Sequence, residues 1–204
     1  MSRPARLLSI VALIVVAAVG GALAMVIQHG VSALDEPTAM ERWLARTTRR
    51  LATPRAARAA PNPVAATPDV LSRARAHFAD HCASCHGNDG RGNTAMGRNL
   101  YPKAPDMTLP DTQSLSDGEL FYVIENGVRL TGMPAWGSTG SHDATESWEL
   151  VHFVRHLSKI TPEEHGQMED LNPKSRKELD EEEQTRRFLH GEGEAPPLLS
   201  GHKH

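Results

Sequence analysis

Cysteine, aromatic residues and long apolar runs are all scarce in this chain of 204 residues. Two cysteines are too few for a disulfide framework. A second span-length apolar segment is lacking, which excludes a multi-span transporter. Once the apolar N-terminal run and the acidic C-terminal end are set aside, about 130 residues remain, too few for a large enzyme. The formal net charge of −3 gives no electrostatic reason to expect a nucleic acid partner.

The one long apolar run is Leu7–Ile27, 21 residues without a charge, preceded by two arginines. At about 1.5 Å per residue it would span roughly 30 Å, the thickness of a bilayer core. This length favours a retained membrane anchor, residues 1–33, over a secretory signal peptide, whose apolar region is about 7–15 residues long. Cleavage after Ala33 stays open as the alternative and would release a soluble protein. Either way, the rest of the chain is expected in the periplasm, held at the inner membrane through residues 7–27 if the anchor is retained.

Residues 34–68 are predicted to form a basic amphipathic helix and a linker. Asp35-Glu36-Pro37-Thr38 is typical of a helix start. Apolar side chains then recur at helical spacing among arginines, at Met40, Trp43, Leu44 and Leu51. The helix could lie on the outer membrane surface, dock onto a partner subunit or pack on its own domain. The Pro/Ala-rich residues 59–68 are expected to be a tether, about 30 Å long at 3.1 Å per residue.

Residues 69–160 are the candidate globular domain, for which we expect an all-α fold of three main helices and long loops. The first helix is predicted to begin at Asp69, its candidate N-cap. The second begins with the capping-box pattern Ser116-Asp117-Gly118-Glu119 and ends at Gly127. The third covers residues 144–157, where apolar residues recur at helical spacing. The long Gly/Pro-rich loops between these helices need something to order them, and a large bound apolar cofactor would do so.

Residues 161–204 contain 11 acidic residues against 6 lysines and arginines, with few large apolar side chains. This composition predicts a mostly solvated acidic tail. A helix is expected only around Lys174–Leu189.

The two cysteines lie in Cys82-Ala-Ser-Cys85-His86, the Cys-x-x-Cys-His signal of c-type haem attachment. Helical positions three apart bring two side chains to one side, about 5–6 Å apart at Cβ. Each thiol can there form a thioether with one vinyl group of the porphyrin, and His86 follows as the proximal iron ligand. A single motif predicts one covalently attached haem c.

Three other uses of the cysteine pair are less compatible with the sequence. A thioredoxin-type dithiol belongs beside a βαβ pattern, whereas a helix precedes this motif and no strand alternation follows. Zinc would need two further ligands at suitable spacing, and there is no second cysteine pair. A disulfide closing so short a loop would contribute little stability.

Met133 is the candidate for the second axial ligand. It lies in Gly132-Met133-Pro134-Ala135-Trp136, and its separation from His86 leaves a helix between them, so that the chain can cross to the far side of the ring. Met96 and Met107 are alternatives on the first long loop, and a methionine can also be a flexible core filler. Ligation by histidine and methionine raises the reduction potential and suits electron transfer.

With these motifs in place, residues 77–157 resemble the class I cytochrome c family. The resemblance rests on the helix leading into the cysteine motif, the Leu100–Asp106 loop, the segment around Met133 and an aromatic-bearing last helix. It implies an all-α fold with crossing first and last helices and with His86 and Met133 as axial ligands. More narrowly, the chain resembles bacterial membrane-anchored monohaem cytochromes c.

The resulting hypothesis is a membrane-anchored one-electron carrier rather than an enzyme. Its partners would be a redox-protein donor and acceptor, with no small-molecule substrate. Two alternatives remain: a haem subunit of a larger membrane redox complex, and a haem-based gas sensor with an open sixth position.

Overall fold

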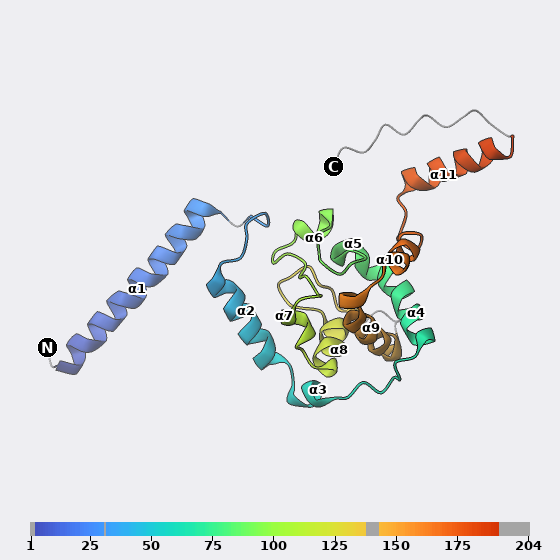
Figure 1. Cartoon of the computed structure of the whole chain (residues 1–204). Coiled ribbons are helices and arrows are strands. Elements are labelled where there is room, and N and C mark those ends of the chain that lie inside the picture. Colours follow the sequence, from blue (N-terminus) through green and yellow to red (C-terminus); the bar gives the residue numbers. More distant parts are fainter. Residues whose placement is uncertain (1–2, 31, 138–142, 192–204) are drawn as a thin grey trace.

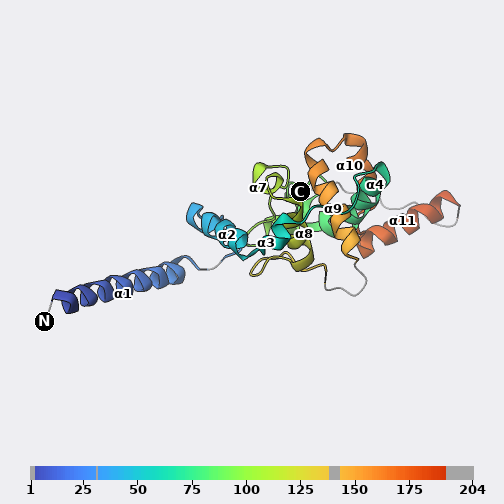
Figure 2. The same ribbon diagram turned by 90° about the horizontal axis from the view of Figure 1, so that it is seen from below.

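The computed structural model describes residues 3–30, 32–137 and 143–191, and every regular element within them is helical. The predicted all-α class is therefore confirmed. Val31 of the alternative cleavage site and residues 192–204 of the predicted tail lie outside the described residues. Helix α1 (Arg3–His29) contains an apolar stretch, Pro4–Gln28, that is long enough to cross a membrane, a test that a signal sequence also passes. It extends away from the rest of the molecule in both views (Figures 1 and 2).

Helix α2 (Ala39–Ala52) begins where the sequence predicts a helix start. Thr38 and Glu41 form a capping box, in which the Thr38 backbone N–H donates to Glu41 Oε2 at 2.6 Å and the Glu41 N–H donates to Thr38 Oγ1 at 3.2 Å. These bonds satisfy two donors that the first helical turn would otherwise leave free. No residue of α2 is buried, although the helix lies beside the globular domain (Figure 1).

The globular domain is built on α4 (Pro68–His77), α8 (Asp117–Asn126) and α9 (Ala144–His156), and α9 packs against the other two. The π-helical turn η1 (Phe78–Cys82) and α5 (Ala83–His86) continue α4, and the 3₁₀ turn η2 (Leu157–Lys159) continues α9. The loop between α5 and α8 carries two one-turn helices, α6 (Ala95–Arg98) and α7 (Pro110–Gln113). The centre of the core is aromatic, since the buried rings of Phe78 and Phe153 lie 5.0 Å apart.

Two of the three predicted helix starts are confirmed, and the other is wrong by one residue. Ser116 caps α8 in the expected capping box, and α9 begins at Ala144. Asp69, however, is not an N-cap: the Thr67 side chain accepts from the Val70 N–H at 3.2 Å, and Pro68 occupies the first helical position. Proline suits this position because its fixed φ is helical and the missing N–H is not needed there.

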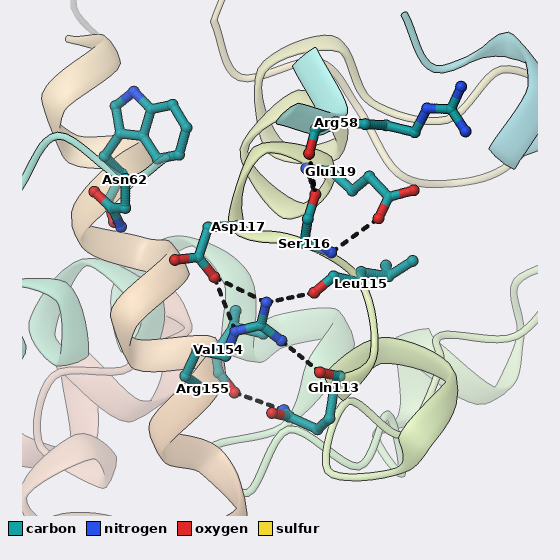
Figure 3. Close-up of polar contacts among 10 residues, drawn as sticks. Arg58, Asn62, Gln113, Leu115, Ser116, Asp117, Glu119, Val154 and Arg155 are labelled. Atoms are coloured by element: carbon teal, nitrogen blue, oxygen red, sulfur yellow. Dashed lines mark hydrogen bonds and ion pairs between the residues drawn. The ribbon is translucent and has the colours of Figure 1, made fainter. Parts of the chain in front are cut away.

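The end of the long α5–α8 loop is fixed to α9 by Arg155, as Figure 3 shows. Its guanidinium donates to Asp117 Oδ1 at 2.8 Å, to the Gln113 carbonyl at 2.7 Å and to the Leu115 carbonyl. The Gln113 side chain in turn donates to the Val154 carbonyl at 2.9 Å. Side chains of the chain itself therefore order this part of the loop.

The Pro/Ala-rich residues 59–68, predicted to be a tether, lie along α8 and α9 in the structure. The Ser116 hydroxyl donates to the Arg58 carbonyl at 2.8 Å, and the Asn62 amide donates to the Trp148 carbonyl at 3.0 Å. The His152 ring Nε2 lies 2.8 Å from the Val64 carbonyl. We call residues 54–66, including the short helix α3 (Arg55–Ala59), the strap.

The segment after residue 160 also differs from the expected solvated tail. Helix α10 (Pro162–Glu169) packs on the domain, and its Met168 is fully buried in the core. Glu164 of α10 pairs with His156 Nε2 at 2.9 Å and with Arg75 Nη1 at 3.2 Å. Helix α11 (Arg176–Leu189) has no buried residue and fits the predicted helix around 174–189.

Candidate functional site

The cysteine motif occupies the end of the first helical stretch of the domain. Cys82 is the last residue of η1, and Cys85 and His86 lie in α5. The Ala83 N–H donates to the Phe78 carbonyl, five residues back, which defines the π turn. Such turns occur frequently at functional sites, and no local sequence pattern predicts this one. Both thiols are free.

His86 is half-buried, and its ring carries a polar atom without a partner. Nδ1 is buried and makes no hydrogen bond of ordinary geometry. Burial lowers the pKa of His86, and the backbone carbonyl of Pro105 opposes part of this shift. The ring is therefore neutral at pH 7, the form in which imidazole binds a metal. A metal-ligating histidine usually donates its other ring N–H to a carboxylate or a backbone carbonyl. Pro105 supplies such a carbonyl.

Cys82 has the electrostatic character of a structural thiol. Burial, together with the neighbouring Cys85, raises the pKa of Cys82 to about 12. A thioredoxin-type nucleophile needs the opposite shift, towards a thiolate at neutral pH. The environment of Cys82 therefore argues against a thioredoxin-type redox dithiol. It suits a cysteine that lies among apolar groups.

The first half of the long loop packs tightly against the motif. Gly92 has φ +70°, and a Cβ there would collide with the Ala104 backbone. A Cβ on Gly97 would collide with the Cys85 carbonyl. The Met107 N–H donates to the Gly90 carbonyl at 2.8 Å. These close approaches bring the chain from Gly92 to Met107 alongside α5, which is how Pro105 comes to act on His86.

Met133 lies in the loop after α8, half-buried. The loop is fixed by its own hydrogen bonds, from the Met133 N–H to Thr131 Oγ1 at 3.1 Å and from the Val128 N–H to the Met133 carbonyl at 3.1 Å. The residues beside Met133 in the sequence contact the elements around the cysteine motif. A Cβ on Gly132 would lie 2.6 Å from a methyl group of Leu100.

Trp136 makes the second such contact, because its ring lies 5.5 Å from that of His81. The Met133 loop thus borders both the Leu100 loop and the motif helix. Among the described residues no hydrogen bond or ring contact joins Met133 to His86, and ligation by Met133 is a prediction.

The other methionines differ in burial. Met107 is buried in the core, and its carbonyl accepts from the Gln113 amide at 2.7 Å. Met96 is 55% exposed. Met107 thus fits the role of a core filler.

Tyr101 contacts α2, a helix outside the globular domain. Its hydroxyl donates to Glu41 Oε1 of α2 at 3.1 Å, across 60 positions of sequence. The sequence contains no signal for this contact between the globular domain and α2.

An all-helical domain whose first helix ends in Cys-x-x-Cys-His, and whose last helix packs on that first helix, has the architecture of a class I cytochrome c-like haem domain. Comparison with family models supports this class. Residues 69–154 match the family described as "Cytochrome C oxidase, cbb3-type, subunit III". These residues are a class I cytochrome c-like haem domain, which implies haem c binding and electron transfer. The match extends from α4 almost to the end of α9. A search of curated proteins found no match.

Proposed function

We propose that the protein is a monohaem c-type cytochrome that carries single electrons, with the haem bonded to Cys82 and Cys85 and axially ligated by His86 and Met133. The observation that carries this proposal is a Cys-x-x-Cys-His sequence at a helix end, whose half-buried histidine lies beside the Pro105 carbonyl. That carbonyl can accept from one ring N–H of His86 and leaves the other ring nitrogen to bind iron.

When bound, the haem supplies one-electron iron chemistry, and the chain supplies position and surroundings. The thiols of Cys82 and Cys85 fix the group to one helix end. Pro105 orients the His86 ring and increases its basicity. Met133 supplies a thioether sulfur, which raises the reduction potential relative to harder ligands. The aromatic core behind the motif keeps water away, which limits reorganisation on electron transfer.

The cellular placement that fits this function is the periplasmic face of the inner membrane. Helix α1 would be a retained single-pass anchor, and a redox-protein donor and acceptor would meet the exported haem domain. Cleavage after Ala33 would give a soluble periplasmic carrier instead. Intact mass of the purified protein tests both points, because it reports one covalent haem and the presence of residues 1–33. Two free thiols in the matured protein would refute the haem attachment.

The ligand assignment is tested by Met133→Ala, with Met107→Ala as the matched control. Met133→Ala should keep the covalent haem, lower the potential by on the order of 100 mV, within the roughly 0.8 V that axial ligands span, and admit CO rapidly. Met107→Ala should cost stability without changing the ligand spectrum. An unchanged spectrum in Met133→Ala would exclude it as the ligand. Rapid CO binding by the unsubstituted reduced protein would favour a gas sensor.

A second candidate function is a haem subunit of a larger membrane redox complex. The family description favours it, because that family is named for a subunit of an oxidase. Extraction in mild detergent followed by size measurement distinguishes the two. A discrete large assembly that retains the haem would support the subunit, and a particle of the size of one chain would support the independent carrier.

A further inference from the structure

Helix α2 presents an apolar stripe that the described residues of the protein leave uncovered. Met40, Trp43, Leu44 and Leu51 are 75%, 65%, 56% and 77% exposed. Successive side chains on an α-helix are about 100° apart, and this spacing places the four within roughly 100° of one another. A stripe of this width is what an amphipathic helix normally buries.

The haem domain holds α2 from the other side. Glu41 accepts from the Tyr101 hydroxyl at 3.1 Å, and Arg46 pairs with Asp111. On the helical wheel, Glu41 and Arg46 lie roughly 100° and 120° to either side of Met40. The contacts of Glu41 and Arg46 with the domain therefore lie on either side of the helix face opposite the apolar stripe. As long as both contacts are formed, the domain does not cover the stripe. Figures 1 and 2 agree in placing α2 between α1 and the domain.

The chain joining α2 to the apolar helix is short. Only nine residues, 30–38, separate His29 from Ala39. Fully extended, they reach about 30 Å at 3.3–3.6 Å per residue. Lys103 of the haem domain also binds this connection, since its Nζ donates to the Leu34 carbonyl at 3.2 Å. If α1 is a membrane anchor, α2 is confined to the vicinity of the bilayer surface.

We propose that α2 lies in the interfacial layer of the membrane, with its apolar stripe towards the acyl chains and its opposite face bound to the haem domain. This proposal rests on α1 being the retained anchor of the proposed function. The occupant of the stripe is then a phospholipid surface. Helix α2 contains four arginines and one glutamate, and Arg50 lies at the border of the stripe. Arginines at such borders extend their charged ends to the headgroups, and tryptophan is enriched at this depth.

The short connection to α1 already keeps α2 close to the lipid surface. A protein partner would have to displace that surface from the stripe, whereas lipid can cover the stripe without any second protein. The consequence for function is a fixed orientation. The domain surface around Tyr101, Lys103 and Asp111 faces the membrane, and redox partners must approach from the remaining surface.

The test uses the full haem-loaded chain in nanodiscs of phosphatidylcholine and phosphatidylglycerol. A single cysteine is introduced by Leu44→Cys in the stripe, or by Ala45→Cys as the matched control, and labelled with a bimane dye. Both positions are exposed in the protein alone, and Ala45 lies on the far side of the stripe. Leu51→Cys gives a second probe of the stripe should the first variant fold poorly.

Brominated acyl chains should quench the dye at position 44 roughly twofold or more above that at position 45, because an interfacial helix buries its apolar face about 5–10 Å deep. Equal or absent quenching at 44 and 51 would overturn the proposal. If those dyes are also shielded from aqueous iodide, a protein occupant such as a second copy covers the stripe instead. Dye uptake by the unsubstituted chain would refute haem attachment, and a mass lacking residues 1–33 would refute the anchor. Both failures are distinguishable from a failure of the α2 proposal.

Discussion

Replacement of Gly118 by alanine tests whether the strap is a docked part of the fold. Gly118 is buried in the first turn of α8, and a Cβ there would overlap the carbonyl oxygen of Ala57 and lie 2.9 Å from that of Ala60. Both atoms are backbone, so neither can move away without displacing α3. Gly166 in α10 is the matched control, because a Cβ there meets nothing within 4 Å.

The two alanines should change stability in opposite directions. In an open helix, alanine is favoured over glycine by about 0.8–1 kcal/mol, and Gly166→Ala should gain most of this. At Gly118 the strap must shift, which loses the Ser116–Arg58 hydrogen bond and loosens the two bonds made by Asn62 and His152. At about 0.5–1.5 kcal/mol for each bond, the loss exceeds the helical gain. We expect a net destabilisation of about 1–3 kcal/mol.

Guanidinium unfolding of the haem-loaded protein, followed by circular dichroism, measures these differences. Hydrogen exchange locates them: the amides of Arg58 and Ala60, which donate to Pro54 and Ala57 carbonyls, should exchange faster in Gly118→Ala and at the native rate in Gly166→Ala. If Gly118→Ala instead stabilises the protein as much as Gly166→Ala does, with no faster exchange in the strap, the docked strap is wrong.

Three further predictions concern the contacts of Arg155 with the α5–α8 loop, the docking of α10 and the attachment of haem. Arg155→Met should destabilise the domain by about 2–3 kcal/mol, because two loop carbonyls lose their donor, and Arg155→Lys should recover part of this in the same unfolding assay. Burial raises the pKa of Glu164, but hydrogen bonds from His156 and Thr161 and the charge of Arg75 outweigh it and leave the pKa below the ordinary value. The stabilisation by Glu164 is therefore present at neutral pH and is lost as the pH falls through that lowered pKa, so α10 amides should lose exchange protection in acid, whereas Glu164→Gln should lack this dependence. Replacing both motif cysteines by serine should leave little stable holoprotein, and a full yield of attached haem in that variant would contradict the motif assignment.

The elements predictable from the sequence are those whose signals are local. The capping box at Ser116 and the apolar spacing of residues 144–157 each depend on residues within a few positions, and the structure has both helices there. The Cys-x-x-Cys-His motif is equally local, and its class agrees with the family match. The start at Asp69 was one residue off because Thr67 and Asp69 both suit an N-cap, and Pro68 decides between them.

The surroundings of the site could not be predicted in this way, because they join residues far apart in sequence. Nothing near Tyr101 indicates that its hydroxyl meets Glu41, and nothing near His86 indicates that Pro105 supplies the adjacent carbonyl. Residues 161–204 carry 11 acidic residues against 6 lysines and arginines, yet Met168 of α10 is buried in the core.

The strap shows how a Pro/Ala-rich segment predicted to be a tether can also dock on a neighbouring domain. A proline-rich segment is extended and makes few hydrogen bonds with itself. Its carbonyls can therefore accept from donors elsewhere in the protein. Here Ser116 of the α8 cap and His152 of α9 bind the strap carbonyls of Arg58 and Val64, and the Asn62 amide of the strap donates in the other direction, to the Trp148 carbonyl of α9. The same composition that predicts a solvated tether therefore also leaves the acceptors that a neighbouring domain can bind. Whether the segment is a solvated tether or a docked strap depends on where the domain presents its hydrogen-bonding groups. Those positions are set only when the helices pack together.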